Sequence, residues 1–205
     1  MPVPGICRLC QKQADLCESH FIPRALYPTK NQKSATVTRS IASSGPSPHL
    51  KQHLLCRDCE TRFTKKGESE VLKWLAPKAK RFSLAERLKI ALPREEYPDV
   101  ARFAAYEIGL DAAQFAYFAV SIIWRGAVQS WRLPDNTTTS CLDLGSYGDV
   151  ARQYLLGEIE FPHAIMAVIV HRVQRPGGEK YLDHALPGRG SELPKLSFHR
   201  EGRPI

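Results

Sequence analysis

Two Cys-x-x-Cys pairs constrain the fold of this chain more than any other feature. The first pair is Cys7 and Cys10 (CRLC) and the second is Cys56 and Cys59 (CRDC), with 45 residues between the pairs. Four thiolates in this spacing can surround one tetrahedral ion and close the intervening chain into a loop. The pattern predicts a zinc site, with iron as the alternative metal. Because four protein ligands leave no open position, this zinc should be structural and should not activate water.

The use of cysteine and the N-terminal sequence indicate the compartment. Six cysteines, four of them paired by spacing, favour metal binding in a reducing compartment over disulfides. Residues 1–10 lack a charged leader followed by an apolar run, and the most apolar stretch, residues 115–124, is too short to cross a bilayer. We therefore expect a cytoplasmic protein that does not enter the membrane. The two remaining cysteines, Cys17 and Cys141, are expected to be small buried hydrophobic residues.

The net charge of +8 belongs to one half of the chain. Residues 1–100 contain 18 Lys and Arg against 10 Asp and Glu, whereas residues 101–205 contain 11 of each kind. Basic charge on the half with the metal site favours a polyanionic partner, most simply nucleic acid. Basic surface that only keeps the protein soluble is the alternative. The candidate nucleic-acid contacts are Arg24, Lys30, Lys33, Arg39, Lys51, Lys65 and Lys66.

Local patterns predict an α+β chain that begins with a small module like a zinc ribbon. This module, residues 1–80, should contain a short strand over residues 19–23 that ends at a proline, and a further strand over residues 35–41. A helix should follow the second Cys pair immediately, with Gly67 as a break before a second helical run.

A mainly helical domain, residues 81–205, is expected to follow. Ser83 and Glu86 match a capping box, and Asp111 should cap a long helix that is apolar nearly all round. Arg125 lies inside that helix and must find a partner or a water-filled edge. This domain is also where a protein partner or a second copy of the chain would bind. The expected elements are helices over 84–92, 100–108, 111–131 and 147–156, and a C-terminal hairpin of strands over 161–173 and 180–185.

The sequence CRLC…SHFIP…LLCRDCETRF resembles the zinc-stapled HNH endonucleases of the His-Me finger, or ββα-metal, class over about residues 7–70. The resemblance implies that His20, at the end of the first strand, is the general base that takes a proton from water attacking a phosphodiester. It further implies that the helix opened by the second Cys pair carries ligands of a single catalytic Mg or Mn ion. The implied function is metal-dependent cleavage of DNA.

The chain departs from the family pattern at the residues that would bind the catalytic ion. Ser19 stands where an acidic residue or His usually precedes the base, and the helix after the second Cys pair offers carboxylates where the family ends with His. Because Mg and Mn prefer oxygen ligands, Glu60 is the best candidate ligand and Glu68 the next. The alternative for both is a solvated charge on a helix.

A third departure concerns the residue that orients the base. The family places Asn shortly before the second Cys pair, and this chain offers only His49, Gln52 and His53 there. Among these, His53 is the candidate catalytic residue. The alternative for His20 is a hydrogen-bonded structural histidine, and the alternative function is a non-catalytic zinc module that binds nucleic acid. That module would use the basic loop from Arg24 to Lys51 together with Lys65, Lys66, Lys73, Lys78, Lys80 and Arg81.

Overall fold

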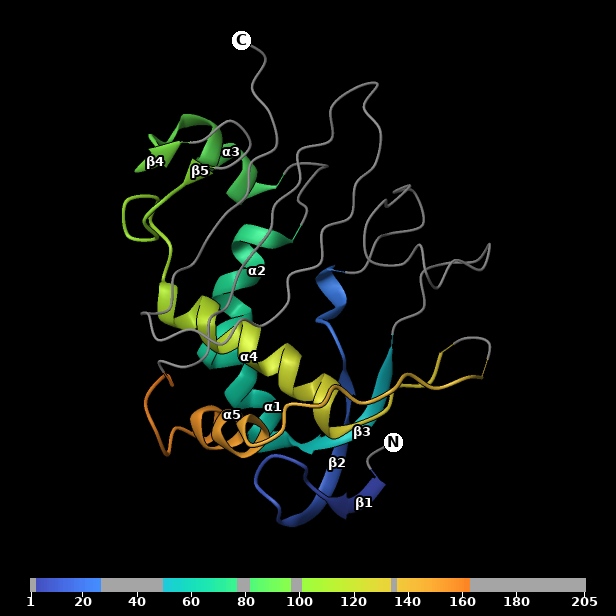
Figure 1. The fold of residues 1–205 in the computed structure, drawn as a ribbon. Helices are drawn as coiled ribbons and strands as arrows, with labels where there is room; N and C mark the ends of the chain where they lie inside the picture. The colour runs from blue at the N-terminus through green and yellow to red at the C-terminus, as the bar shows by residue number, and fades with distance from the viewer. Residues whose placement is uncertain (1–2, 27–49, 77–81, 97–100, 134–135, 163–205) are drawn as a thin grey trace.

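The computed structural model describes residues 3–26, 50–76, 82–96, 101–133 and 136–162. Figure 1 shows a small sheet near the N-terminus, a long helix, α4, crossing the middle of the molecule, and a short strand pair at the far end. The α+β class is confirmed. The elements are β1 (Val3–Ile6), β2 (Gln13–His20), the 3-10 turn η1 (Arg24–Leu26), β3 (Lys51–Cys56), α1 (Arg57–Phe63), the π-helical turn η3 (Thr64–Glu68), α2 (Ser69–Leu75), α3 (Ser83–Ile90), β4 (Glu95–Glu96), β5 (Ala101–Arg102), α4 (Ala112–Val128) and α5 (Tyr147–Leu156).

The sheet is antiparallel in the order β1-β2-β3. The expected strand that includes Ser19 and His20 forms, but it begins earlier, at Gln13, and ends at His20. The register of β2 against β3 shifts between Cys17 and Glu18, which marks a β-bulge. An extra residue reverses the alternation of side chains, so Leu16 and Ser19 are both buried although they are three positions apart.

A single unbroken helical segment runs from Arg57 to Leu75. The helix begins directly after Cys56, as predicted, but Gly67 does not break it. Thr64 and Ser69 both keep helical backbone angles, and the chain passes Gly67 in the π-helical turn η3. A π turn admits one extra residue without ending the helix, which a pattern of glycine alone does not reveal.

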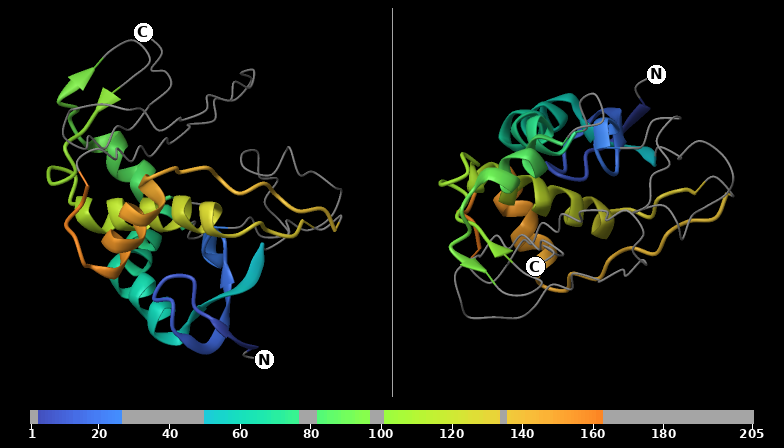
Figure 2. Two further views of the ribbon diagram at one scale, coloured as in Figure 1. Left: turned by 60° about the horizontal axis from the view of Figure 1, so that its bottom comes forward. Right: turned by 90° about the horizontal axis from the view of Figure 1, so that it is seen from above.

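Gly67 permits close packing between η3 and α4. A Cβ atom added at this glycine would lie 3.0 Å from both the carbonyl oxygen of Gln114 and the backbone nitrogen of Phe118. Both atoms belong to the backbone of α4, which cannot move aside as the end of a flexible side chain can. Gly67 is therefore required by the approach of α4, and α4 crosses the helical segment at this turn (Figure 2).

We expect Gly67→Ala to lower the free energy of unfolding by about 1–3 kcal/mol, because overpacking against a rigid backbone outweighs the better helix propensity of alanine. Gly148→Ala is the matched control in α5, since its added Cβ would meet only the Cβ of Leu144 at 4.0 Å. The control should be neutral or slightly stabilising. Urea denaturation of both variants measures the difference, and equal stability of the two would contradict this account.

Three expectations for the helical part are corrected by the structure. The capping box is wrong, because Phe82 occupies the N-cap position of α3 and Ser83 already belongs to the helix. The amphipathic helix over residues 100–108 is also wrong: Ala101 and Arg102 pair with β4, and a turn closed by hydrogen bonds from Glu107 and Gly109 follows. The helix capped by Asp111 ends at Val128, three residues short of Trp131.

Other expectations for the helical part are confirmed. The Asp111 carboxylate accepts a hydrogen bond from the Gln114 backbone N–H, as an N-cap should, and α5 spans residues 147–156 as predicted. The strands expected over 35–41, 161–173 and 180–185 lie wholly or mostly outside the described residues. Within the described part of the chain, no helix is long and apolar enough to cross a membrane.

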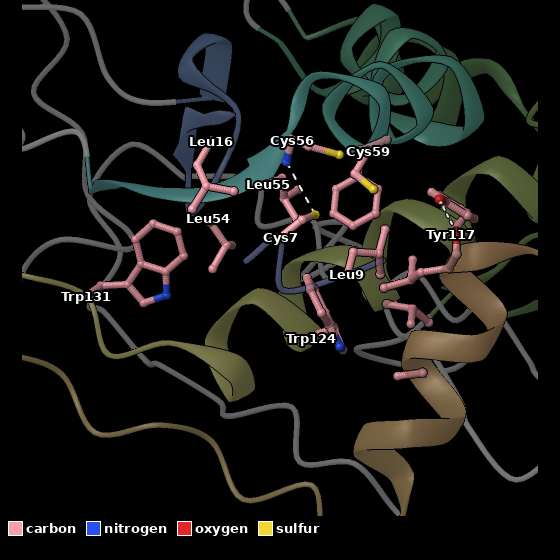
Figure 3. Packing of buried hydrophobic residues seen from close by; sticks show 14 of the residues in the cluster. Cys7, Leu9, Leu16, Leu54, Leu55, Cys56, Cys59, Tyr117, Trp124 and Trp131 are labelled. Atoms are coloured by element: carbon pink, nitrogen blue, oxygen red, sulfur yellow. Dashed lines mark hydrogen bonds between the residues drawn. The ribbon is translucent and has the colours of Figure 1, made fainter. Parts of the chain in front are cut away.

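The main hydrophobic core is shared by both sides of the expected boundary at residue 80. Figure 3 shows Leu9 and Leu55 near the cysteines, packed in one cluster with Tyr117 and Trp124 of α4. Leu155 of α5 belongs to the same cluster. A second cluster joins α2, α3 and the start of α4. The strands β2 and β3 and helix α1 therefore depend on α4 and α5 to cover their apolar face.

Candidate metal centre and the polar cluster beside it

The four cysteines of the two pairs meet in one cluster. Cys7 and Cys10 lie in the turn after β1, Cys56 ends β3 and Cys59 lies in the first turn of α1. The four sulfur atoms all lie within 4.8 Å of one another. The backbone N–H of Cys56 donates to the sulfur of Cys7 at 3.3 Å (Figure 3). The predicted convergence is confirmed, and these residues could bind a metal ion.

The electrostatics of the cluster suit thiolate ligands. A hydrogen bond from the Cys59 thiol lowers the pKa of Cys7 to about 4, and backbone N–H groups act in the same direction against the effect of burial. The same hydrogen bond and burial raise the pKa of Cys59. The protons of the neighbouring thiols therefore favour the thiolate form of Cys7. A cation among the four sulfurs would replace those protons, so the donor set fits a thiophilic metal.

Helix α5 fixes the first Cys pair to the helical part. The Arg152 guanidinium donates to the carbonyl oxygen of Leu9 at 3.2 Å, and Arg62 of α1 donates to the carbonyl oxygen of Leu156 at 2.8 Å. Tyr117 of α4 donates to the carbonyl oxygen of Leu155 at 2.7 Å. The four-cysteine cluster is therefore supported by the carboxyl-terminal helices α4 and α5.

His20 lies on the outer face of the sheet at the end of β2. It pairs with Lys51, and Glu18 pairs with His53, so these four residues share one face. Lys51 donates to Glu18 at 2.8 Å, and this bond, followed by the charges of Lys51, His53 and His20, lowers the pKa of Glu18. His20 is half-buried and His53 is exposed. The two candidate histidines are thus brought to the same face, away from the helix.

Ser19 faces the opposite way, toward α1. Its side chain is 1 % exposed, and its hydroxyl donates to the Glu60 carboxylate. Burial raises the pKa of Glu60, while the Ser19 hydrogen bond and the charge of Arg125 oppose that effect. Positions 19 and 60 are those to which the family resemblance assigns the catalytic ion. The structure brings them together, and their oxygen donors suit Mg or Mn.

Glu68 has a different partner. Its carboxylate binds the guanidinium of Arg125 at 2.7 Å, with the Arg125 side chain only 2 % exposed. The predicted need of Arg125 for a partner inside an apolar helix is met by this ion pair. Because Glu68 is held by a cation, Glu60 is the better placed of the two candidate ligands. No sequence pattern predicts this pairing, since it joins residues 57 positions apart.

The remaining candidates are placed as follows. Gln52 donates to the Ser130 carbonyl oxygen at 2.6 Å and accepts from Gln129 at 2.9 Å, so its amide is directed at the end of α4 and not at His20. Cys17 is half-buried, and the prediction of a buried Cys141 is wrong because Cys141 is exposed. Among the basic candidates, the exposed ones are Arg24, Lys51, Lys65 and Lys66, whereas Lys30, Lys33, Arg39 and also His49 lie outside the described residues.

Comparison of this chain with family models, with curated proteins and with solved structures found no match.

Proposed function

We propose that this protein is a metal-dependent endonuclease of the HNH type that cleaves DNA and carries a structural zinc on Cys7, Cys10, Cys56 and Cys59. The observation that carries the proposal is the order of elements around the cysteines. An antiparallel strand pair, β2 and β3, leads directly into α1, and the end of β2 brings Ser19 against Glu60. This is the arrangement expected of a ββα-metal module.

Glu60, Ser19 and His20 have different roles in the proposed cleavage of DNA. Glu60 would hold a divalent ion, with the Ser19 hydroxyl beside it. When bound, that ion supplies charge stabilisation to the phosphorane and to the leaving oxygen. His20 accepts the proton of the attacking water, since a neutral imidazole can do so near neutral pH. Because Ser19 and His20 face opposite ways, the scissile phosphate must lie across the end of β2 to meet both.

Exposed basic residues would hold the DNA backbone. Lys65 and Lys66 project from η3 on the same helical segment that carries Glu60, and Arg24 follows the end of β2. These contacts read phosphate charge and no base sequence, so they position the substrate without selecting it. A cytoplasmic location and a further protein partner or second copy at the helical part remain predictions.

A non-catalytic zinc module that binds nucleic acid is the second candidate. The observation that favours it is the Ser19 hydroxyl at a position where active members of the family have a charged or imidazole ligand. In this chain the Glu60 carboxylate is already hydrogen-bonded there. Under this alternative the basic surface binds nucleic acid and His20 is structural.

Supercoiled plasmid incubated with the purified protein separates the two candidates. We expect nicking in Mn or Mg that EDTA abolishes and that Glu60→Gln lowers by at least about tenfold, since the variant keeps an acceptor for Ser19 but loses the charge. Asp15→Asn, at an exposed carboxylate on β2, removes a charge away from Glu60 and is the control, which should nick like the wild type.

The affinity for DNA, measured at several salt concentrations, is the second measurement. With several phosphate contacts, log K for DNA should fall linearly with log salt concentration. Binding with this slope and no nicking in any divalent ion would contradict the nuclease and support the non-catalytic module. Neither nicking nor a salt-dependent affinity would contradict both candidates.

A further inference from the structure

The π-helical turn brings two carboxylates to one side of a helix. Glu60 and Glu68 are eight residues apart, which in an uninterrupted α-helix separates them by about 80° around the axis. One extra residue in the turn removes about 100° of that rotation, so the two residues then face the same way. The ion pair agrees with this placement, since Arg125 of α4 binds Glu68 and its charge also reaches Glu60.

Arg125 holds this turn from α4. Its Nη2 donates to Glu68 at 2.7 Å, and its guanidinium lies over the ring of Phe63 at 4.7 Å from the ring centre. Phe63 ends α1 and Glu68 ends η3, so the guanidinium contacts the helical segment on both sides of the extra residue. Within the described part of the chain, Nε and Nη1 of Arg125 are buried and have no hydrogen-bond partner.

Burying the guanidinium of Arg125 costs free energy of hydration, which suggests that its charge serves a further group. A guanidinium that is 2 % exposed gives up its hydration, and one carboxylate returns only part of that energy. A pair of apolar residues would fill the same space at no such cost. The charge of Arg125 also acts on Glu60, whose carboxylate accepts a hydrogen bond from Ser19. One guanidinium therefore serves both Glu60 and Glu68.

We propose that Arg125 is a positioning residue of the candidate nuclease site: by binding Glu68 across η3 it fixes the π-helical turn and keeps Glu60 directed at Ser19. The inference rests on the proposed function for its catalytic consequence. It also makes α4, from the carboxyl-terminal half, a necessary part of a site whose other residues come from the first 68 positions.

The test removes both charges together, in the variant Arg125→Met with Glu68→Met. Replacing both partners avoids an unpaired buried charge, so the protein should keep its zinc and its cooperative unfolding. We expect kcat for plasmid nicking to fall about 10- to 100-fold, as when a partner that orients a ligand is lost, with KM for DNA changed less than about twofold. The matched control is Lys89→Met with Glu86→Met, an exposed pair on α3 at 3.1 Å, which should behave as the wild type.

Amide hydrogen exchange provides a readout that does not need activity. In the double variant the amides of residues 64–69 should exchange at least about tenfold faster than in the wild type, while those of α5 should not change. If the wild type fails to nick DNA, the proposed function fails, and exchange alone then decides whether Arg125 holds the turn. Unchanged exchange at residues 64–69 would overturn the inference, and so would an unchanged kcat in an active enzyme.

Arg125→Lys covers the case in which the double variant does not fold. Lysine keeps a cation for Glu68 but has neither the planar fork nor the stacking on Phe63. We expect the same two effects in the same direction and of smaller size. Wild-type kcat and exchange in a folded Arg125→Lys variant would show that charge alone is sufficient and would overturn the positioning role.

Discussion

A Cys59→Ser variant is expected to lose its metal and to unfold as a whole chain. The binding free energy of a structural zinc is on the order of 10 kcal/mol, which is as large as the entire stability of an ordinary domain. Cys59 lies in the first turn of α1, and its neighbours Leu9, Leu55 and Phe63 belong to the core that also contains Trp124. Loss of the metal should therefore release the helical part together with the Cys pairs.

Tryptophan fluorescence measures this outcome directly. Trp124 and Trp131 are 1 % and 2 % exposed in the folded chain, so unfolding should shift their emission to the red in Cys59→Ser and in wild type treated with a strong chelator. Cys141→Ser is the matched control, because this cysteine is exposed and lies outside the metal cluster. A Cys59→Ser variant with buried tryptophans and a cooperative transition at the wild-type temperature would show that the four sulfurs are not a structural metal site.

The convergence of the four cysteines was predictable because it depends on local spacing. Two residues between cysteines force each pair into one turn, and two such turns in a reducing environment have few uses other than a shared ion. The helix after Cys56 and the cap at Asp111 were predictable for the same reason, since each depends on a few adjacent residues. These features follow from the sequence with no knowledge of the rest of the fold.

The geometry of the polar cluster was not predictable in this way. The bulge between Cys17 and Glu18 turns Ser19 toward the helix and His20 away from it. The alternation of polar and apolar residues in the sequence does not predict where such an extra residue is inserted. The pairing of Glu68 with Arg125 connects residues 57 positions apart, and a glycine in a helical pattern does not by itself reveal a π turn. For residues 101–108, burial of Phe103 and Ile108 is achieved by a strand and a turn, so apolar spacing alone predicted the wrong element.

His20→Ala is expected to lower the rate of plasmid nicking by about 10²- to 10⁴-fold, the usual contribution of a general base. Zinc content and the unfolding temperature should stay near those of the wild type, because His20 lies at the end of β2 on the outer face of the sheet and outside the core clusters. The fall should appear in kcat, since a base acts on the attacking water and not on the affinity for DNA.

Two further measurements distinguish a base from a structural histidine at this position. Added imidazole should restore part of the activity of His20→Ala if the missing group is a proton acceptor. If His20 is only structural, added imidazole should not restore activity. His20→Gln should also remain inactive, because glutamine can keep hydrogen bonds but cannot take a proton. If His20→Gln nicks DNA at the wild-type rate, His20 orders the end of β2 through hydrogen bonds. The proton of the attacking water must then pass to another group on the same face, and His53, which pairs with Glu18, is the imidazole that this face offers within the described residues.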